Sequence, residues 1–130
     1  MIMERLRKTE RLIEETAQEY KLNIDELMEM MARGKESEAI ETALHYALNK
    51  IAMDAPDWTF LAARLYLQKL YAEAAENRGY KEDLKYGSFS ELVQTLVEKG
   101  IYSAELTQAY SRSELDEAAA EIMPERDYIF

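Results

Sequence analysis

The chain has 130 residues, enough for one domain with a hydrophobic core and too few for two domains of ordinary size. Hydrophobic residues make up 48% and charged residues 32%, which is typical of a folded protein rather than of a disordered one. The 26 acidic residues outnumber the 16 Lys and Arg residues, and the resulting net charge of -10 disfavours nucleic acid as a partner.

The absence of cysteine excludes disulfides, thiolate metal ligands and cysteine nucleophiles from this chain. No apolar run approaches the ~18 residues of a membrane span, and the charged N-terminus lacks the apolar segment of a signal peptide. We therefore expect a cytoplasmic protein with no membrane partner.

Apolar residues recur with helical period along the whole chain, and only four glycines and two prolines interrupt them. This pattern predicts an all-α fold, a compact orthogonal bundle of about six to seven helices. A first helix is expected over residues 4–20 and a second over 24–33. For the second, Asn23 and Glu26 have the spacing of a reciprocal cap, and Gly34 can provide a left-handed end.

A third helix should begin at an N-cap on Ser37 and end near Asp54, because Pro56 cannot continue it. Its apolar stripe is expected to be buried. The stripe consists of Ile40, Ala43, Leu44, Ala47, Leu48 and Ile51.

The stretch "DAPD" then predicts a corner between two helices. Proline suits the first turn of a helix, and Asp54 and Asp57 can cap its free N–H groups and complement its dipole. The next helix, over residues 56–78, carries apolar residues, Trp58 among them, on most of its circumference and should be the central helix.

The remaining helices are expected to be short. Gly79 should end the central helix. Ser88 with Glu91 should cap the next helix, which Gly100 stops. Ser103 should start a short turn of helix, and Ser111 with Glu114 should cap the last helix, which Pro124 ends. The apolar end, Tyr128 to Phe130, suggests a segment that continues or packs against something outside the chain.

Arg64 is the most unusual polar residue, because it lies two turns inside the central helix. A charge there needs a partner, and Asp54, Asp57 or an acid of another segment can supply one. We interpret Arg64 as a structural ion pair that fixes the corner; a functional contact is the alternative.

No other side chain indicates catalysis or metal binding. His45 and Glu41 share a helix face at a spacing that two metal ligands can use, but a solvated pair is the simpler interpretation, since metal sites need three or four ligands. Met28, Met30 and Met31 fit either core packing or a soft binding groove. Two acidic groups, Glu14, Glu15 and Glu19 and then Glu36, Glu38 and Glu41, are expected to be solvated helix faces.

Four motifs resemble, in order and spacing, the N-terminal helical region of the large (α) subunit of class I ribonucleoside-diphosphate reductase. They are "DAPDWTFLAARLYLQKLY", "SFSELVQTLVEKGIYSAEL", "YSRSELDEAAAEI" and "ERDYIF". The resemblance implies a scaffold or regulatory segment of an oxidoreductase that makes deoxyribonucleotides for DNA replication. It also implies that the chain is not catalytic alone, because the family's redox cysteines lie beyond it. The implied partner is the catalytic barrel of the same subunit. The chain would then be a truncated form of that subunit or one piece of a split subunit, and homo-oligomerisation stays open.

Residues 1–53 resemble, less closely, the later helices of the family's ATP cone, and residues 54–130 the start of the helical domain. Nucleotide-binding relatives have a threonine, a histidine and a lysine where this sequence has Glu36, Ile40 and Ala72. The resemblance therefore implies a degenerate cone with no cofactor, in which ATP or dATP binding is not expected. Lys69 is the one candidate nucleotide ligand. A free-standing acidic helical interaction module is the alternative function.

Overall fold

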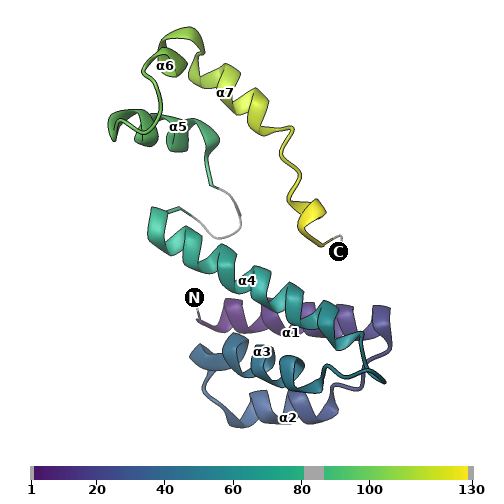
Figure 1. Ribbon diagram of the computed structural model, residues 1–130. Helices are drawn as coiled ribbons and strands as arrows, with labels where there is room; N and C mark the ends of the chain where they lie inside the picture. Colours follow the sequence, from purple (N-terminus) through teal and green to yellow (C-terminus); the bar gives the residue numbers. More distant parts are fainter. Residues whose placement is uncertain (1, 81–86, 129–130) are drawn as a thin grey trace. The chain divides into compact units, whose positions relative to one another are not determined.

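The structure is a computed structural model that describes residues 2–80 and 87–128. Within these residues it contains helices and no strand, which confirms the predicted all-α class (Figure 1). The elements are α1 (Ile2–Tyr20), α2 (Asp25–Arg33), η1 (Glu36–Glu38), α3 (Ala39–Lys50), α4 (Trp58–Arg78), α5 (Phe89–Glu98), α6 (Glu105–Ala109), α7 (Arg112–Ala119) and η3 (Pro124–Tyr128), where η marks a 3-10 helix.

Contacts divide the chain into two units, and the division falls inside α4, between Leu70 and Tyr71. The first unit contains α1 to α3 and most of α4, and the second contains the end of α4 and α5 to η3. The division predicted after residue 53 concerns a resemblance to two protein regions rather than packing, and it stays a prediction.

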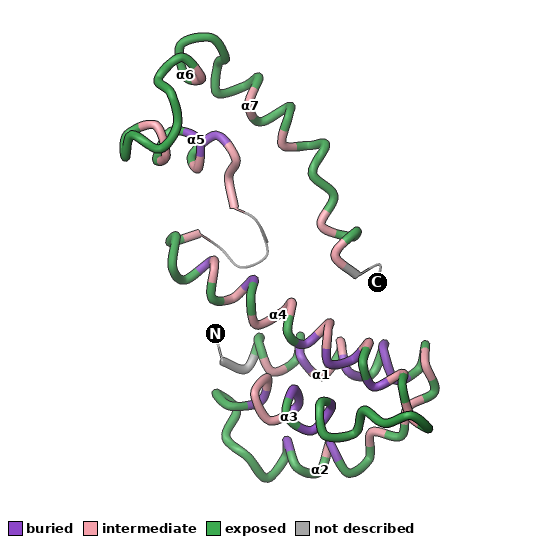
Figure 2. The backbone as a smooth tube through the Cα atoms, in the orientation of Figure 1, coloured by how far each residue is buried: buried purple, intermediate pink, exposed green. Residues whose placement is uncertain are grey.

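The hydrophobic core of the first unit is built by α1 to α4, where the buried positions gather (Figure 2). Its fully buried large side chains include Ile13 of α1, Leu27 of α2, and Leu61 and Leu65 of α4. Burying each such side chain contributes roughly 1.5–3 kcal/mol. The prediction that the fourth helix packs in the core is therefore confirmed for its first half.

Two predicted helix ends differ from the structure. The side chain of Asn23 accepts a hydrogen bond from the N–H of Asp25 at 3.2 Å, and α2 begins without the reciprocal cap expected with Glu26. Gly34 ends α2 in an extended conformation, with φ -83° and ψ 177°, rather than in the left-handed one. Its N–H still donates to the carbonyl of Met30 at 3.0 Å, so the helix end is satisfied without a positive φ.

The start and the buried face of α3 also differ from the prediction. Ser37 lies inside η1, so α3 begins at Ala39 without a side-chain cap. The buried residues of α3 are Ala39, Ala43, Leu44, Tyr46 and Ala47. The predicted stripe ran too far, because Leu48 and Ile51 are 49% and 38% exposed near the end of the helix, where the corner turns away.

The corner between α3 and α4 is a tight turn, as the "DAPD" motif predicts, but its hydrogen bonds differ. The N–H of Ala55 donates to the carbonyl of Ala52, and α4 begins at Trp58 rather than at Pro56. The N–H of Thr59 donates to the carbonyl of Pro56 at 3.0 Å. The first N–H groups of α4 thus donate to main-chain carbonyls, although the sequence predicted that the side chains of the corner would accept these hydrogen bonds.

In the second unit, several predicted signals are confirmed. Ser88 is the N-cap of α5, and its hydroxyl oxygen accepts a hydrogen bond from the N–H of Glu91 at 3.4 Å. Gly79 and Gly100 follow helix ends with φ near +73° and +74°, a conformation that favours glycine. Ser111 and Glu114 form the complete capping box of α7, with both hydrogen bonds at 3.2 Å. However, α7 ends at Ala119, before Pro124, which instead begins η3. The predicted apolar tail falls largely on residues 129–130, outside the described part of the chain.

Candidate functional site

Arg64 joins α4 to α1. Its Nη1 donates to Oε2 of Glu19 at 2.8 Å and to Oγ1 of Thr16 at 3.1 Å. The Arg64 side chain is only 13% exposed, whereas that of Glu19 is 54% exposed. The hydrogen bond from Arg64 holds the pKa of Glu19 below its usual 4.5. The expected ion pair therefore exists, and its acid comes from another segment.

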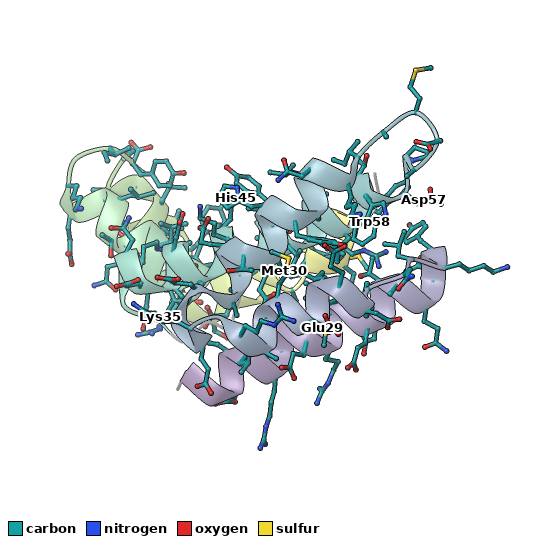
Figure 3. All side chains as sticks on the ribbon, turned by 90° about the horizontal axis from the view of Figure 1, so that it is seen from below. Glu29, Met30, Lys35, His45, Asp57 and Trp58 are labelled. Atoms are coloured by element: carbon teal, nitrogen blue, oxygen red, sulfur yellow. The ribbon has the colours of Figure 1, made fainter. Side chains whose placement is uncertain are left out.

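These contacts join Arg64 to α1, and its predicted link to the corner stays a prediction. Asp54 is exposed and Asp57 half-buried at the corner, while Glu19, which pairs with Arg64, lies near the end of α1. Figure 3 shows Asp57 and Trp58 next to one another where α4 begins. Arg64 therefore contributes to the packing of α4 on α1.

A seam of polar contacts continues along α1 and α4 on the same side as Arg64. Nε2 of Gln68 donates to Oγ1 of Thr9 at 3.2 Å, one turn along α4 and two turns along α1 from the Arg64–Thr16 contact. Thr9 also donates to the carbonyl of Arg5, which satisfies its buried hydroxyl group. Polar pairs of this kind set the register of two helices, because sliding one along the other breaks them together.

Aromatic packing closes one end of this seam. The rings of Tyr20 and Phe60 are stacked, with centroids 4.5 Å apart and planes within 4° of parallel. The guanidinium of Arg64 lies 5.4 Å from the centroid of the Tyr20 ring, within range of a cation–π interaction. Arg64 is thus held by a carboxylate, a hydroxyl group and a ring, all from α1.

Lys69, the candidate nucleotide ligand, is paired with an acid of α3. Its Nζ lies 2.7 Å from Oε1 of Glu41, and the hydrogen bond from Lys69 lowers the pKa of that carboxyl group. The other oxygen of Glu41 lies 3.6 Å from Nε2 of His45, whose side chain is 72% exposed. The solvated His45–Glu41 pair is thus confirmed, while Glu41 belongs to an interhelical contact that the sequence did not predict.

The three sequence positions thought to replace nucleotide ligands carry no positively charged side chain. Glu36 is exposed in η1, Ile40 is half-buried in α3, and Ala72 is half-buried in α4. Among the described residues, no group of three or more His, Cys, Asp or Glu side chains has the arrangement of a metal site. Of the methionine cluster, Met31 is buried and Met28 packs against the core, whereas Met30 is 41% exposed on α2 (Figure 3).

A groove that sequence reasoning missed lies beside Trp58 in the first unit. Its volume is about 440 Å³, and its lining includes Asn23, Asp25, Glu26, Tyr46, Lys50, Ala55 and Trp58. The hydroxyl of Tyr46 donates to Glu26 at 3.1 Å, and its ring meets that of Trp58 edge to face at 5.6 Å. Burial, together with the nearby Glu26 carboxylate, raises the pKa of Tyr46. Nζ of Lys50 lies 3.9 Å from Oε2 of Glu26, so these two charged groups of the groove pair with each other.

The second unit has a smaller cavity of about 340 Å³, to which α5 and α7 both contribute. Nη2 of Arg112 donates to Oε1 of Glu91 at 3.2 Å and ties the start of α7 to the first turn of α5. Both side chains are more than 60% exposed, so the contact adds little stability.

Sequence reasoning also missed the buried threonines. Thr9 and Thr16 are fully buried, and periodicity that counts only apolar residues treats them as polar positions. The usable signal was their spacing of seven residues on the same face as Ile13, which places all three against a neighbour.

These contacts define a helical module in which two cations of α4, Arg64 and Lys69, are paired with acids of α1 and α3. Comparison with known proteins gives the particular relationship. The chain is related to a segment of the alpha subunit of ribonucleoside-diphosphate reductase. It is 35% identical to that subunit of Synechocystis sp. over 81 residues, which are 62% of this chain and 10% of the relative. It is 28% identical to the Helicobacter pylori subunit over 116 residues, 89% of this chain and 14% of the relative.

A third relative supports the same relationship. The alpha subunit of Treponema pallidum is 30% identical over 95 residues, 73% of this chain and 11% of the relative. The chain thus spans about a tenth to a seventh of the length of these relatives, consistent with an N-terminal region of the large subunit. The resemblance predicted from the four motifs is confirmed.

The remaining comparisons are negative: no family model matches the chain, and no solved structure matches it. None of the described helices is long and apolar enough to cross a membrane.

Proposed function

We propose that this chain is a helical scaffold or regulatory segment of a ribonucleotide reductase large subunit and does not catalyse ribonucleotide reduction by itself. The observation that carries the proposal is the sequence relationship to alpha subunits seven to ten times longer than the matched segments. The lack of cysteine supports it, because a reaction that uses redox cysteines needs residues this chain does not contain. The segment would act in the cytoplasm, in the synthesis of DNA precursors.

The partner in this proposal is the catalytic remainder of the large subunit. The test is to mix the purified chain with the Helicobacter pylori alpha subunit from which the matched segment has been removed, after its fold is checked by circular dichroism. Analytical ultracentrifugation should detect a complex, and the complex should regain reductase activity. If the two proteins sediment separately, the alternative of a free-standing acidic interaction module is favoured.

We further propose that residues 1–53 form a degenerate ATP cone that does not bind ATP or dATP. Binding a triphosphate needs positive charge and hydrogen-bond donors, and the candidate ligand Lys69 contacts the Glu41 carboxylate at 2.7 Å. Isothermal titration calorimetry with ATP and dATP tests this proposal. The expected result is no heat of binding at millimolar nucleotide, and a saturable heat that Lys69→Met abolishes would refute it.

A further inference from the structure

Helix α4 is apolar on two opposite sides along its first four turns. One side, which includes Leu61 and Leu65, is buried in the core of the first unit. The other carries Ala63, Tyr66, Leu67 and Leu70, which recur at steps of three and four residues and so share a face. We call these four residues the outer face of α4.

The outer face is not covered by the first unit. Tyr66 is 50% exposed and Leu70 is 40% exposed, while Ala63 and Leu67 are half-buried. A helix with apolar residues on all sides is normally enclosed by protein, because each exposed apolar side chain forgoes the free energy of burial. The outer face therefore has the composition of a contact surface rather than of a solvated one.

We propose that the outer face of α4 docks against an apolar surface, rimmed by basic residues, in the part of a reductase large subunit that lies outside this chain. This inference rests on the proposed function and names the surface through which the segment attaches. The Helicobacter pylori match spans 116 of the 130 residues, so only 14 remain outside it. A match of that length must span residues 15–116, which include all of α4. In that relative the counterpart of α4 therefore belongs to a polypeptide about seven times longer than the match, which can supply the covering surface.

Charge favours this occupant over a second copy of the chain. The net charge is -10, so two copies would bring together two strongly acidic bodies. Long-range electrostatics would instead favour a partner with basic residues around an apolar centre. Glu73, one turn beyond Leu70, is an exposed acid at the edge of the outer face.

The experiment uses the double variant Tyr66→Gln, Leu70→Gln, which removes apolar surface and keeps residues of good helix propensity. The control is Met53→Gln, which makes the same kind of change at a fully exposed apolar residue away from the outer face. Affinity for the Helicobacter pylori alpha subunit without its matched segment is measured by analytical ultracentrifugation. The double variant should bind about tenfold more weakly or worse, and the control should bind like the wild type. Thermal unfolding of each free chain should be unchanged.

The possible outcomes separate this inference from the proposed function. If the wild-type chain fails to bind, both the proposed function and the docking face are wrong. If the wild type binds and the double variant binds equally well, the docking face is wrong and the proposed function stands. Self-association of the wild type that the double variant abolishes would assign the face to a second copy. Destabilisation of the free double variant would mean that the chain itself covers the face.

Discussion

The Arg64–Glu19 pair is asymmetric, and this decides how each residue responds to substitution. The guanidinium of Arg64 is nearly buried, whereas the carboxylate of Glu19 is half exposed to water. A buried charge that loses its counter-charge is costly, whereas an exposed carboxylate that loses its partner is hydrated again. The carboxylate of Glu19 therefore mainly offsets the free-energy cost of burying the charge of Arg64.

Glu19→Gln should consequently destabilise the first unit more than Arg64→Met does. Methionine fills much of the volume of the arginine stem and removes the buried charge, so replacement of Arg64 should have a small effect. Urea unfolding followed by Trp58 fluorescence provides the comparison. The matched control is the Arg33–Glu29 pair of α2, whose side chains are 80% and 71% exposed, and whose substitution should change little. A larger loss for Arg64→Met than for Glu19→Gln would contradict this account.

Glu19 and Glu41 should also make stability depend on pH. Hydrogen bonds from Arg64 and Lys69 lower the pKa of these carboxyl groups below the ordinary 4.5. A lowered folded-state pKa stabilises the protein above the unfolded value, and this contribution is lost as pH falls through the folded-state value. The free energy of unfolding, measured in urea from pH 7 to pH 3, should therefore decrease below about pH 4.5.

The double variant Glu19→Gln, Glu41→Gln is the test of this assignment. It should show a shallower decrease in the free energy of unfolding below about pH 4.5 than the wild type shows. An unchanged slope would mean that other carboxyl groups carry the dependence.

Among the helices, capping signals were predictable to the extent that they act locally. Ser111 and Glu114 need only each other, and the capping box formed as expected. The cap at Asn23 shifted by one residue, because α2 begins where Leu27 can reach the core. The partner of Arg64 could not be derived from sequence, since Glu19 lies 45 residues away and pairs only once α1 and α4 have packed.

The cap of α7 can be tested by itself. Ser111→Ala removes the hydroxyl that accepts from the Glu114 N–H and should reduce local stability by about 1 kcal/mol. Hydrogen exchange at the amides of α7 is the measurement, and faster exchange is the expected result. Ser113→Ala, at an exposed position of the same helix, should leave exchange unchanged or slower. Equal effects of the two changes would show that the cap does not hold α7.

At the level of the entire chain, the two units differ in how much they bury. Most of the buried residues lie in the first unit, whereas α6 and α7 contain none. The class and the location of this core followed from periodicity, because the apolar residues of α1 to α4 are dense and regularly spaced. The division inside α4 could not be predicted from periodicity, since the apolar pattern runs through the helix without interruption.

The two units should therefore unfold at different concentrations of urea. Trp58 is the only tryptophan and is buried in the core of the first unit, so its fluorescence reports that unit alone. Far-ultraviolet circular dichroism reports all helices and should begin to fall at a lower concentration. Leu65→Ala should reduce the stability seen by fluorescence by about 3 kcal/mol and leave the first dichroism change in place. Coincident transitions in the wild type would show a single cooperative structure.

The exposed corner before α4 also makes the molecule convenient to label. Met53 is 102% exposed relative to a reference residue, and the sequence contains no cysteine. Met53→Cys would therefore introduce a unique thiol that a maleimide dye can reach without disturbing the core. Energy transfer from Trp58, five residues further along the chain, to such a dye would follow the opening of the corner.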